Sequence, residues 1–433
     1  MSEGEDRQEV KPSRFGFALV LVFLVFEYSR PQDVVPAIGA LRPTWLLLPL
    51  MFIAWAQSPN FRKVANPQLA LMLLMAALLA VYIPLAVNHH EAFEQTEDYL
   101  LIILPFCVSV ILFVDTRERV LSLMRWWVLL ALYIAVRAIL GHGIAGSNFL
   151  GDPNDVSLLL NMMLPFALCM LVYERRGSWR VIYLGISLMC LAGVVATGSR
   201  GGFVGLIAML AFLWLISPRK LAILLALCIL AVGAYNFAPQ SYWKRMSTIQ
   251  TTDLSAHGRT DDPDEGSAEE RLKSWRAAWE MFKDHPLGVG PGNFPIRFPE
   301  YQGKMFGEHG MWGRQAHSLW LTLLSELGIP GTVLYALLLR ANWRSLRRLN
   351  RVPTGEGQDR LAYLLSVAFM ASLAGFFASA TFLSVLFYVH YWYLSAMIVA
   401  AERTLASALP APGEPVRSDP VTALPGVQAK TET

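Results

Sequence analysis

The chain carries Glu270-Arg271-Leu272-Lys273-Ser274-Trp275-Arg276 in the middle of a polar segment, residues 238–316, that interrupts strongly apolar sequence on both sides. This segment is rich in Arg, Trp and His, and it contains a Gly/Pro-rich stretch at 285–294. A simple connector between membrane-spanning regions needs none of these side chains. We therefore expect the chemistry of this protein to be carried out at this segment.

The sequence around the polar segment is typical of a polytopic membrane protein. Hydrophobic residues make up 55% of 433 positions and only 16% are charged, a balance that soluble domains do not have. Apolar runs long enough to cross a core about 30 Å thick predict an all-α protein with about twelve transmembrane helices. The runs lie near 15–27, 43–56, 68–87, 99–114, 120–140, 156–173, 180–197, 202–216, 220–237, 316–339, 361–381 and 383–401. The second and eighth runs are short, and the last two could also form one span with a re-entrant piece.

Positive charges alternate between the predicted loops. Lys and Arg beside spans are retained on the cytoplasmic side, and alternate connections carry most of them, including Arg14, Arg117, Arg175 and the five arginines in 340–351. The alternation places the polar segment on the outer side, which is the periplasm in a Gram-negative cell. The predicted organisation is a cytoplasmic N-terminus (1–14), a membrane domain of about nine spans (15–237), a periplasmic catalytic loop (238–316), about three further spans (317–403) and a disordered cytoplasmic tail (404–433).

The polar segment contains a helix with one apolar stripe. Ser267 and Glu270 have the spacing of a capping box, and apolar residues then follow at 272, 275, 279 and 282, a helical period. The stripe predicts a helix on the membrane surface with Trp at headgroup depth. Arg271 lies beside the stripe, one turn before Trp275. It could meet lipid phosphates at an ordinary interfacial helix, or point into a cavity toward a phosphorylated lipid substrate.

Two further arginines stand at the outer ends of predicted spans. Arg200 lies in the hairpin Thr197-Gly198-Ser199-Arg200-Gly201-Gly202, where glycines let a ligand or another backbone approach closely. A tight turn with a snorkelling Arg would have the same sequence. Arg137, near the outer end of the fifth run, needs a polar partner or cavity because charge is costly inside a membrane.

A histidine stands at the end of the polar segment. His317 begins the apolar run after it, so we expect it at the same depth as Arg200. Most histidines are structural, but a neutral imidazole is suited to take a proton from a hydroxyl near neutral pH. No His, Asp or Glu spacing resembles a zinc site, so no metal is predicted.

Four motifs follow one another along the chain: Thr197–Gly202, Glu270–Trp275, His285–Phe294, and Ala316-His317-Ser318 followed by Leu324-Ser325-Glu326-Leu327-Gly328. In this order they resemble the bacterial O-antigen ligases and the related O-antigen polymerases and O-linked oligosaccharyltransferases. Asn154 lies in Gly151-Asp152-Pro153-Asn154-Asp155, which is similar to the Pro-Asn element of that family. The resemblance covers roughly 145–335.

The resemblance implies a GT-C-like architecture and glycan transfer at the outer face of the inner membrane. A glycan on an undecaprenyl-diphosphate carrier would pass to an acceptor hydroxyl, such as that of lipid A–core, with no cofactor and no metal. His317, Arg200 and Arg271 are the expected catalytic residues, because guanidiniums stabilise the charge that develops on a diphosphate leaving group. The expected substrate-binding residues are Arg276, Arg137, Asn154, Trp275 and Asn293. The expected partners are the glycan donor, the acceptor and the lipid bilayer. No nucleic acid is expected to bind.

Other functions stay open at this point. A polymerase or an O-oligosaccharyltransferase would place nearly the same demands on Arg and His as a ligase. Twelve spans also suit a transporter, although the large loop does not divide the chain into equal halves, and a non-catalytic assembly factor is a further alternative. Gly288–Gly292 has a Gly-x-Gly-x-Gly pattern but follows no strand, so we interpret it as a shaped turn and not as a nucleotide loop.

Overall fold

The computed structural model describes residues 13–41, 43–59, 61, 64–221, 224–225, 228, 263–307, 313–352 and 360–406. Every regular element in these stretches is helical, which confirms the predicted all-α class. Most of the predicted ninth span, loop residues 238–262, and nearly all of the predicted N-terminal segment and tail lie outside the described residues.

The helices follow the apolar runs closely. The first half contains α1 (Arg14–Ser29), α2 (Pro31–Val34), α3 (Pro36–Ala40), α4 (Pro43–Ala56), α5 (Pro67–Tyr82), η2 (Ile83–Leu85), α6 (His89–Asp98), η3 (Tyr99–Ile103), α7 (Leu104–Phe113) and α8 (Arg117–Leu140). From residue 148 onward the chain contains η4 (Asn148–Leu150), α9 (Pro153–Tyr173), α10 (Gly177–Thr197), α11 (Arg200–Ile216), α14 (Pro263–Asp284), α15 (Phe294–Phe306), α16 (Leu319–Asn350), α17 (Leu361–Ala380) and α18 (Val389–Leu405).

Seven described helical stretches are long and apolar enough to cross a membrane. Two shorter apolar helices, α4 and α11, coincide with the two short runs in the sequence. The chain is therefore a multi-pass membrane protein, and the count of twelve spans stays a prediction. The seven are Pro67–Leu85, His89–Phe113, Arg117–Leu140, Pro153–Tyr173, Gly177–Thr197, Leu319–Asn350 and Leu361–Ala380.

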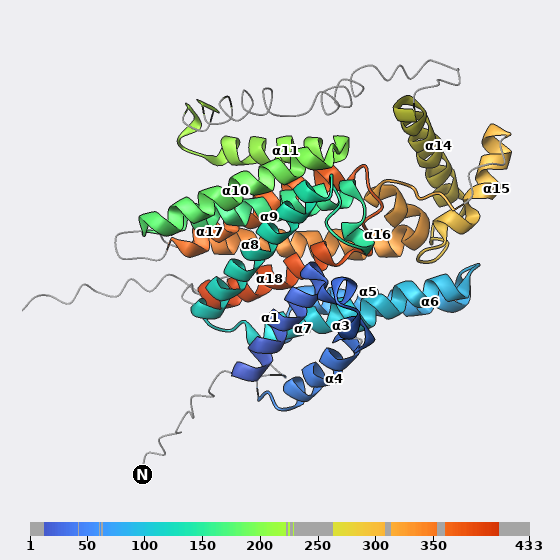
Figure 1. Ribbon diagram of the computed structural model, residues 1–433. Coiled ribbons are helices and arrows are strands. Elements are labelled where there is room, and N and C mark those ends of the chain that lie inside the picture. The colour runs from blue at the N-terminus through green and yellow to red at the C-terminus, as the bar shows by residue number, and fades with distance from the viewer. Residues whose placement is uncertain are drawn as a thin grey trace, which may run out of the picture.

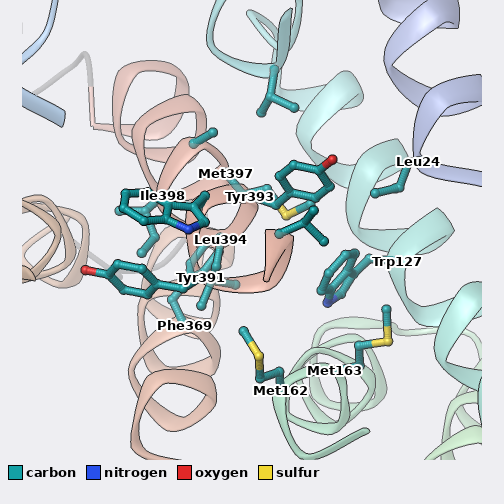
Figure 2. Close-up of a cluster of buried hydrophobic side chains, with 14 of the residues drawn as sticks. Leu24, Trp127, Met162, Met163, Phe369, Tyr391, Tyr393, Leu394, Met397 and Ile398 are labelled. Atoms are coloured by element: carbon teal, nitrogen blue, oxygen red, sulfur yellow. The ribbon is translucent and has the colours of Figure 1, made fainter. Parts of the chain in front are cut away.

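Helix α9 is the centre of the bundle. It packs against α8, α10, α11 and α17, which run beside it in Figure 1, and 78% of its apolar stretch is buried inside the protein, the highest share among the seven. Figure 2 shows Met162 and Met163 of α9 facing Trp127 and the aromatic residues of α18. Among lipid tails such packing, rather than the hydrophobic effect, holds helices together.

Glycines allow α11 to lie close to its neighbours. A Cβ on Gly202 would meet Ser157 Oγ at 2.1 Å, and one on Gly205 would meet Ser379 Oγ at 1.9 Å and the backbone oxygen of Gly375 at 2.8 Å. Ser379 donates to the carbonyl of Gly201 (3.2 Å) and Asn161 donates to that of Gly202 (2.7 Å). Small residues and interhelical hydrogen bonds thus fix the position of the helix that begins at Arg200.

The polar segment lies at one end of the bundle as α14 and α15 (Figure 1). Helix α14 begins at Pro263, so Ser267 lies inside the helix and the predicted N-cap is wrong. Proline at the start of a helix is favoured because its φ is already helical and no amide hydrogen is lost there. Helix α16 bends at Gly328, whose φ of 58° and ψ of −155° are not helical.

Gly205→Ala should destabilise the protein by about 1–3 kcal/mol, because the new methyl group overpacks against the α17 backbone. Thermal unfolding in detergent should show a Tm several degrees lower. The matched control is Gly185→Ala on α10, where a Cβ meets nothing within 4 Å. An equal loss of Tm in both variants would contradict the close-packing account.

Candidate active site

Three helices begin at the same place and bring the predicted residues together. Helix α9 starts after Asp152, α11 starts at Arg200, and α16 starts after His317. Ser199 donates to Asn154 Oδ1 at 2.6 Å, which joins the starts of α9 and α11. Trp275 of α14 is within hydrogen-bonding range of the His317 carbonyl (3.4 Å), which joins the polar segment to the start of α16.

Positive charge is concentrated where these starts meet. Arg271 is half-buried, and its pKa is lowered by burial and by repulsion from Arg200 and Arg314. The carboxylate of Asp152 acts in the opposite direction and favours the charged guanidinium. Arg200, Arg271, Arg314, His317 and Asp152, which we call the site cluster, therefore lie within electrostatic range of one another or of Arg271.

His317 is held in an unusual backbone conformation. Its φ is 46°, a left-handed value that residues other than glycine seldom adopt and that is enriched at functional sites. Burial and the neighbouring Arg271 and Arg314 lower the pKa of its imidazole to about 4. The ring is therefore neutral at physiological pH and has a lone pair available to accept a proton.

Arg314 is a member of the cluster that the sequence did not single out. Its guanidinium forms an ion pair with Glu270, the residue just before Arg271 on α14. Its Nε is buried with no hydrogen-bond partner within the described part of the chain. A buried donor with no partner is costly, so this atom is available to an anionic ligand. Its position three residues before His317 is the sequence signal that could have identified it.

Asn154 positions Arg200. Its side chain donates to Asp152 Oδ1 (3.0 Å), while its Oδ1 accepts from Ser199, the residue just before Arg200. The Ser199 hydroxyl in turn accepts from the amide of Gly202 (3.0 Å) and caps α11. This chain of hydrogen bonds fixes the backbone from which the Arg200 side chain departs.

Aromatic pairs join α14 and α16 to the end of α17. Trp275 stacks on Phe382 with ring centroids 6.0 Å apart, and Trp320 stacks on Phe377 at 5.3 Å. Trp275 is half-buried, whereas Trp279 one turn further along α14 is 47% exposed. The apolar stripe of α14 thus has one end in the site and the other end at the surface of the protein.

The segment 285–294, which we call the Gly/Pro turn, is held by hydrogen bonds to α16 at the bend of that helix. The Glu326 carboxylate accepts from the amides of Gly292 (2.9 Å) and Phe294 (3.1 Å). Backbone bonds join Val289 N–H to Ser325 O (3.0 Å), Gly290 N–H to Glu326 O (2.9 Å) and Ile329 N–H to Pro286 O (2.9 Å). Two of the quoted motifs therefore meet each other, and together they hold α14 and α16 in register.

The remaining predicted residues lie apart from the cluster. Asn293 is fully buried; its Oδ1 accepts from the Asn88 amide (2.8 Å) and its amide nitrogen binds the carbonyls of Pro291 and Asn88. Arg137 is exposed and its Nε donates to the carbonyl of Ala145 (3.1 Å). Arg276 is exposed on α14. Among the described residues, no group of three or more His, Cys, Asp or Glu side chains could hold a metal ion.

Comparison with known proteins bears on the same region. Residues 184–336 match the family described as O-Antigen ligase, a range that includes Arg200, Arg271, Arg314 and His317 but not Asn154. The chain is also similar to the teichuronic acid biosynthesis protein TuaE of Bacillus subtilis (strain 168), with 26% identity over 222 residues, or 45% of this chain and 44% of that protein. The chain thus matches less than half the length of this relative. The resemblance predicted from the motifs is confirmed.

Glu326→Ala should loosen the Gly/Pro turn, because it leaves two amides without an acceptor, at about 1–3 kcal/mol for each buried group. Hydrogen exchange followed by mass spectrometry should show protection of residues 285–294 reduced at least about tenfold. Glu300→Ala removes an exposed carboxylate from α15 and should leave exchange unchanged. Unaltered protection in Glu326→Ala would show that the carboxylate does not hold the turn.

Proposed function

We propose, from the relationship of this chain to the O-antigen ligase family, that it is a membrane glycosyltransferase that uses a lipid-linked glycan. The donor would be a glycan on an undecaprenyl-diphosphate carrier, and the acceptor a hydroxyl of lipid A–core. The protein would lie in the inner membrane, with about twelve spans and with the site cluster facing the periplasm. The observation that carries the proposal is the gathering of three guanidiniums beside a neutral histidine.

The donor side of the site is suited to a diphosphate. Arg200, Arg271 and Arg314 supply donors for several phosphate oxygens, and charge-assisted bonds from guanidinium are among the strongest in proteins. The starts of α9, α11 and α16 add the positive ends of three helix dipoles. Asp152 and Ser199 cap the first two helices through their side chains, whereas Ser318 makes no side-chain cap. The first amides of α16 are therefore available to an anion.

The reaction would be a single inverting displacement. The acceptor oxygen forms a bond to the anomeric carbon of the glycan while the bond from that carbon to the diphosphate oxygen breaks. The acceptor proton passes to His317, and the lipid diphosphate leaves with the electron pair of the broken bond. Because negative charge grows on the leaving oxygen, guanidiniums already in place stabilise the transition state more than the ground state. No metal is required in this scheme.

Arg314→Gln should lower the transfer rate about 10²–10³-fold, the cost of removing one preorganised donor from a developing charge. Arg200→Ala and Arg271→Ala should lose at least as much. Lys283→Gln is the control, because it removes one positive charge from α14, the helix that carries Arg271, at a position where Lys283 pairs with Glu280 at 2.6 Å. A rate within about twofold of wild type for Arg314→Gln would remove Arg314 from the mechanism.

Acceptor identity is tested with purified protein in lipid and an undecaprenyl-diphosphate glycan. One reaction receives lipid A–core and a second receives no added acceptor. Product on lipid A–core, lost in Arg271→Ala, is the result we expect. Longer lipid-linked chains without added acceptor would instead make the protein a polymerase, the second candidate, which the similarity to the teichuronic acid biosynthesis protein TuaE suggests. Transfer to Ser or Thr of a protein would make it an O-oligosaccharyltransferase, and no transfer at all would favour a transporter.

The pH dependence should differ between free and donor-bound protein. In the free protein the base function of His317 is lost as pH falls through its pKa of about 4. A bound diphosphate neutralises part of the charge on Arg271 and Arg314, and this raises the pKa of His317. The acid limb of kcat should therefore lie at higher pH than that of kcat/KM. Coinciding acid limbs, or an unchanged limb in His317→Gln, would contradict the assignment of His317 as base.

A further inference from the structure

The far end of α16 carries a face of arginines that the proposed reaction does not use. Helix α16 leaves the site at Leu319, bends at Gly328 and continues to Asn350. Arg340, Arg344, Arg347 and Arg351 are all exposed, as is Trp343. With about 100° of rotation per residue, the four arginines fall within an arc of about 60°, and Trp343 lies about 40° beyond one edge of that arc. We call this surface the arginine face.

The opposite side of the same segment packs into the protein. Asn342 donates to Ser395 Oγ of α18 (2.7 Å), and Ser345 accepts from Gln68 at the start of α5 (2.7 Å). Leu346 and Leu349 are fully buried. Arg348, which projects beside the face, forms an ion pair with Glu402 of α18 at 3.0 Å. The orientation of the arginine face is therefore fixed by contacts on three sides of the helix.

The height of the face matches a membrane boundary. Gln68 and Ser366 lie at the ends of α5 and α17 that are remote from the site, and their hydrogen bonds to Ser345 and Asn350 place the end of α16 at that level. At about 1.5 Å per residue, Arg340 lies ~18 Å and Arg351 ~35 Å along the helix from Gly328. A hydrocarbon core about 30 Å thick that begins near Gly328 would end between these two positions. An exposed Trp at this depth is typical of the interface.

We propose that the arginine face binds the phosphate groups of anionic phospholipids in the leaflet opposite the candidate active site. Retention of a loop on one side of a membrane requires positive charge near the span but no shared face, so orientation alone does not account for the arrangement. Planar guanidiniums suit phosphate better than ammonium groups do, because they donate in pairs. Clusters of several Arg beside a span are known to attract anionic lipid.

Lipid binding at this face would hold α16 at a fixed depth. The same helix begins just after His317 and carries Glu326 and the bend that clasps the Gly/Pro turn. An anchor at one end therefore limits the axial movement of the residues at the other end. This proposal does not rest on the proposed glycan transfer.

The test is native mass spectrometry of the full-length protein in detergent with equal amounts of phosphatidylglycerol and phosphatidylcholine of the same acyl chains. Wild type should retain phosphatidylglycerol preferentially, and Arg340→Gln/Arg344→Gln/Arg347→Gln should retain at least about tenfold less. The matched control, Arg175→Gln/Arg176→Gln/Arg180→Gln, removes three exposed arginines before and within the start of α10 and should bind like wild type.

Further variants keep the result interpretable if the triple Gln variant does not fold. Arg344→Gln and Arg347→Gln alone should each weaken retention about threefold, and the triple Lys variant should lie between wild type and triple Gln. Excess inorganic phosphate should not displace the lipid, because phosphatidylglycerol also buries its acyl chains against the apolar surface of the bundle, which free phosphate cannot do. Absence of a phosphatidylglycerol preference in wild type, an equal loss in the matched control, or displacement by free phosphate would overturn the proposal.

Discussion

Repulsion among Arg200, Arg271 and Arg314 is the interaction that the surrounding structure has to overcome. Three guanidiniums gathered in a half-buried site repel one another, and burial together with the charges of Arg200 and Arg314 lowers the pKa of Arg271. Like charges stay together only when the backbone that carries them is fixed from outside the cluster. Within the described part of the chain the buried Nε of Arg314 has no hydrogen-bond partner, so this fixed positive charge can receive an anion without reorganisation.

Three different sets of interactions fix the backbone around the site cluster. Close glycine contacts and the Asn154–Ser199 bond fix the start of α11. The carboxylate of Glu326 holds the Gly/Pro turn that follows α14, and Glu270 pairs with Arg314 in front of α16. The Glu326 carboxylate is buried, so its hydrogen bonds are worth more than bonds at an exposed surface, whereas the Glu270–Arg314 pair is partly exposed. The site is thus a product of the packing around it.

Much of the molecule followed from the sequence because its physical cause is local. An apolar run must become a helix to satisfy its backbone inside a membrane, so helix positions were predicted to within a few residues for most described spans. Capping is also local, yet Ser267 was assigned wrongly because Pro263, four residues earlier, starts the helix equally well. The motifs selected Arg200, Arg271 and His317 as one group of residues, and the catalytic roles assigned to these residues stay predictions.

What the sequence by itself determined is the all-helical membrane class, the polar segment between the spans, and the residue types on which its chemistry would depend. Only the tertiary structure decided which of them meet. It added Arg314 and Asp152 to the cluster, placed Asn293 in a buried turn, and left Arg137 and Arg276 at the surface. The reason is physical: the contacts that sort these side chains join residues tens to hundreds of positions apart, such as Asn88 with Asn293 and Glu270 with Arg314. Such contacts are set by the packing of whole helices, and no local pattern encodes them.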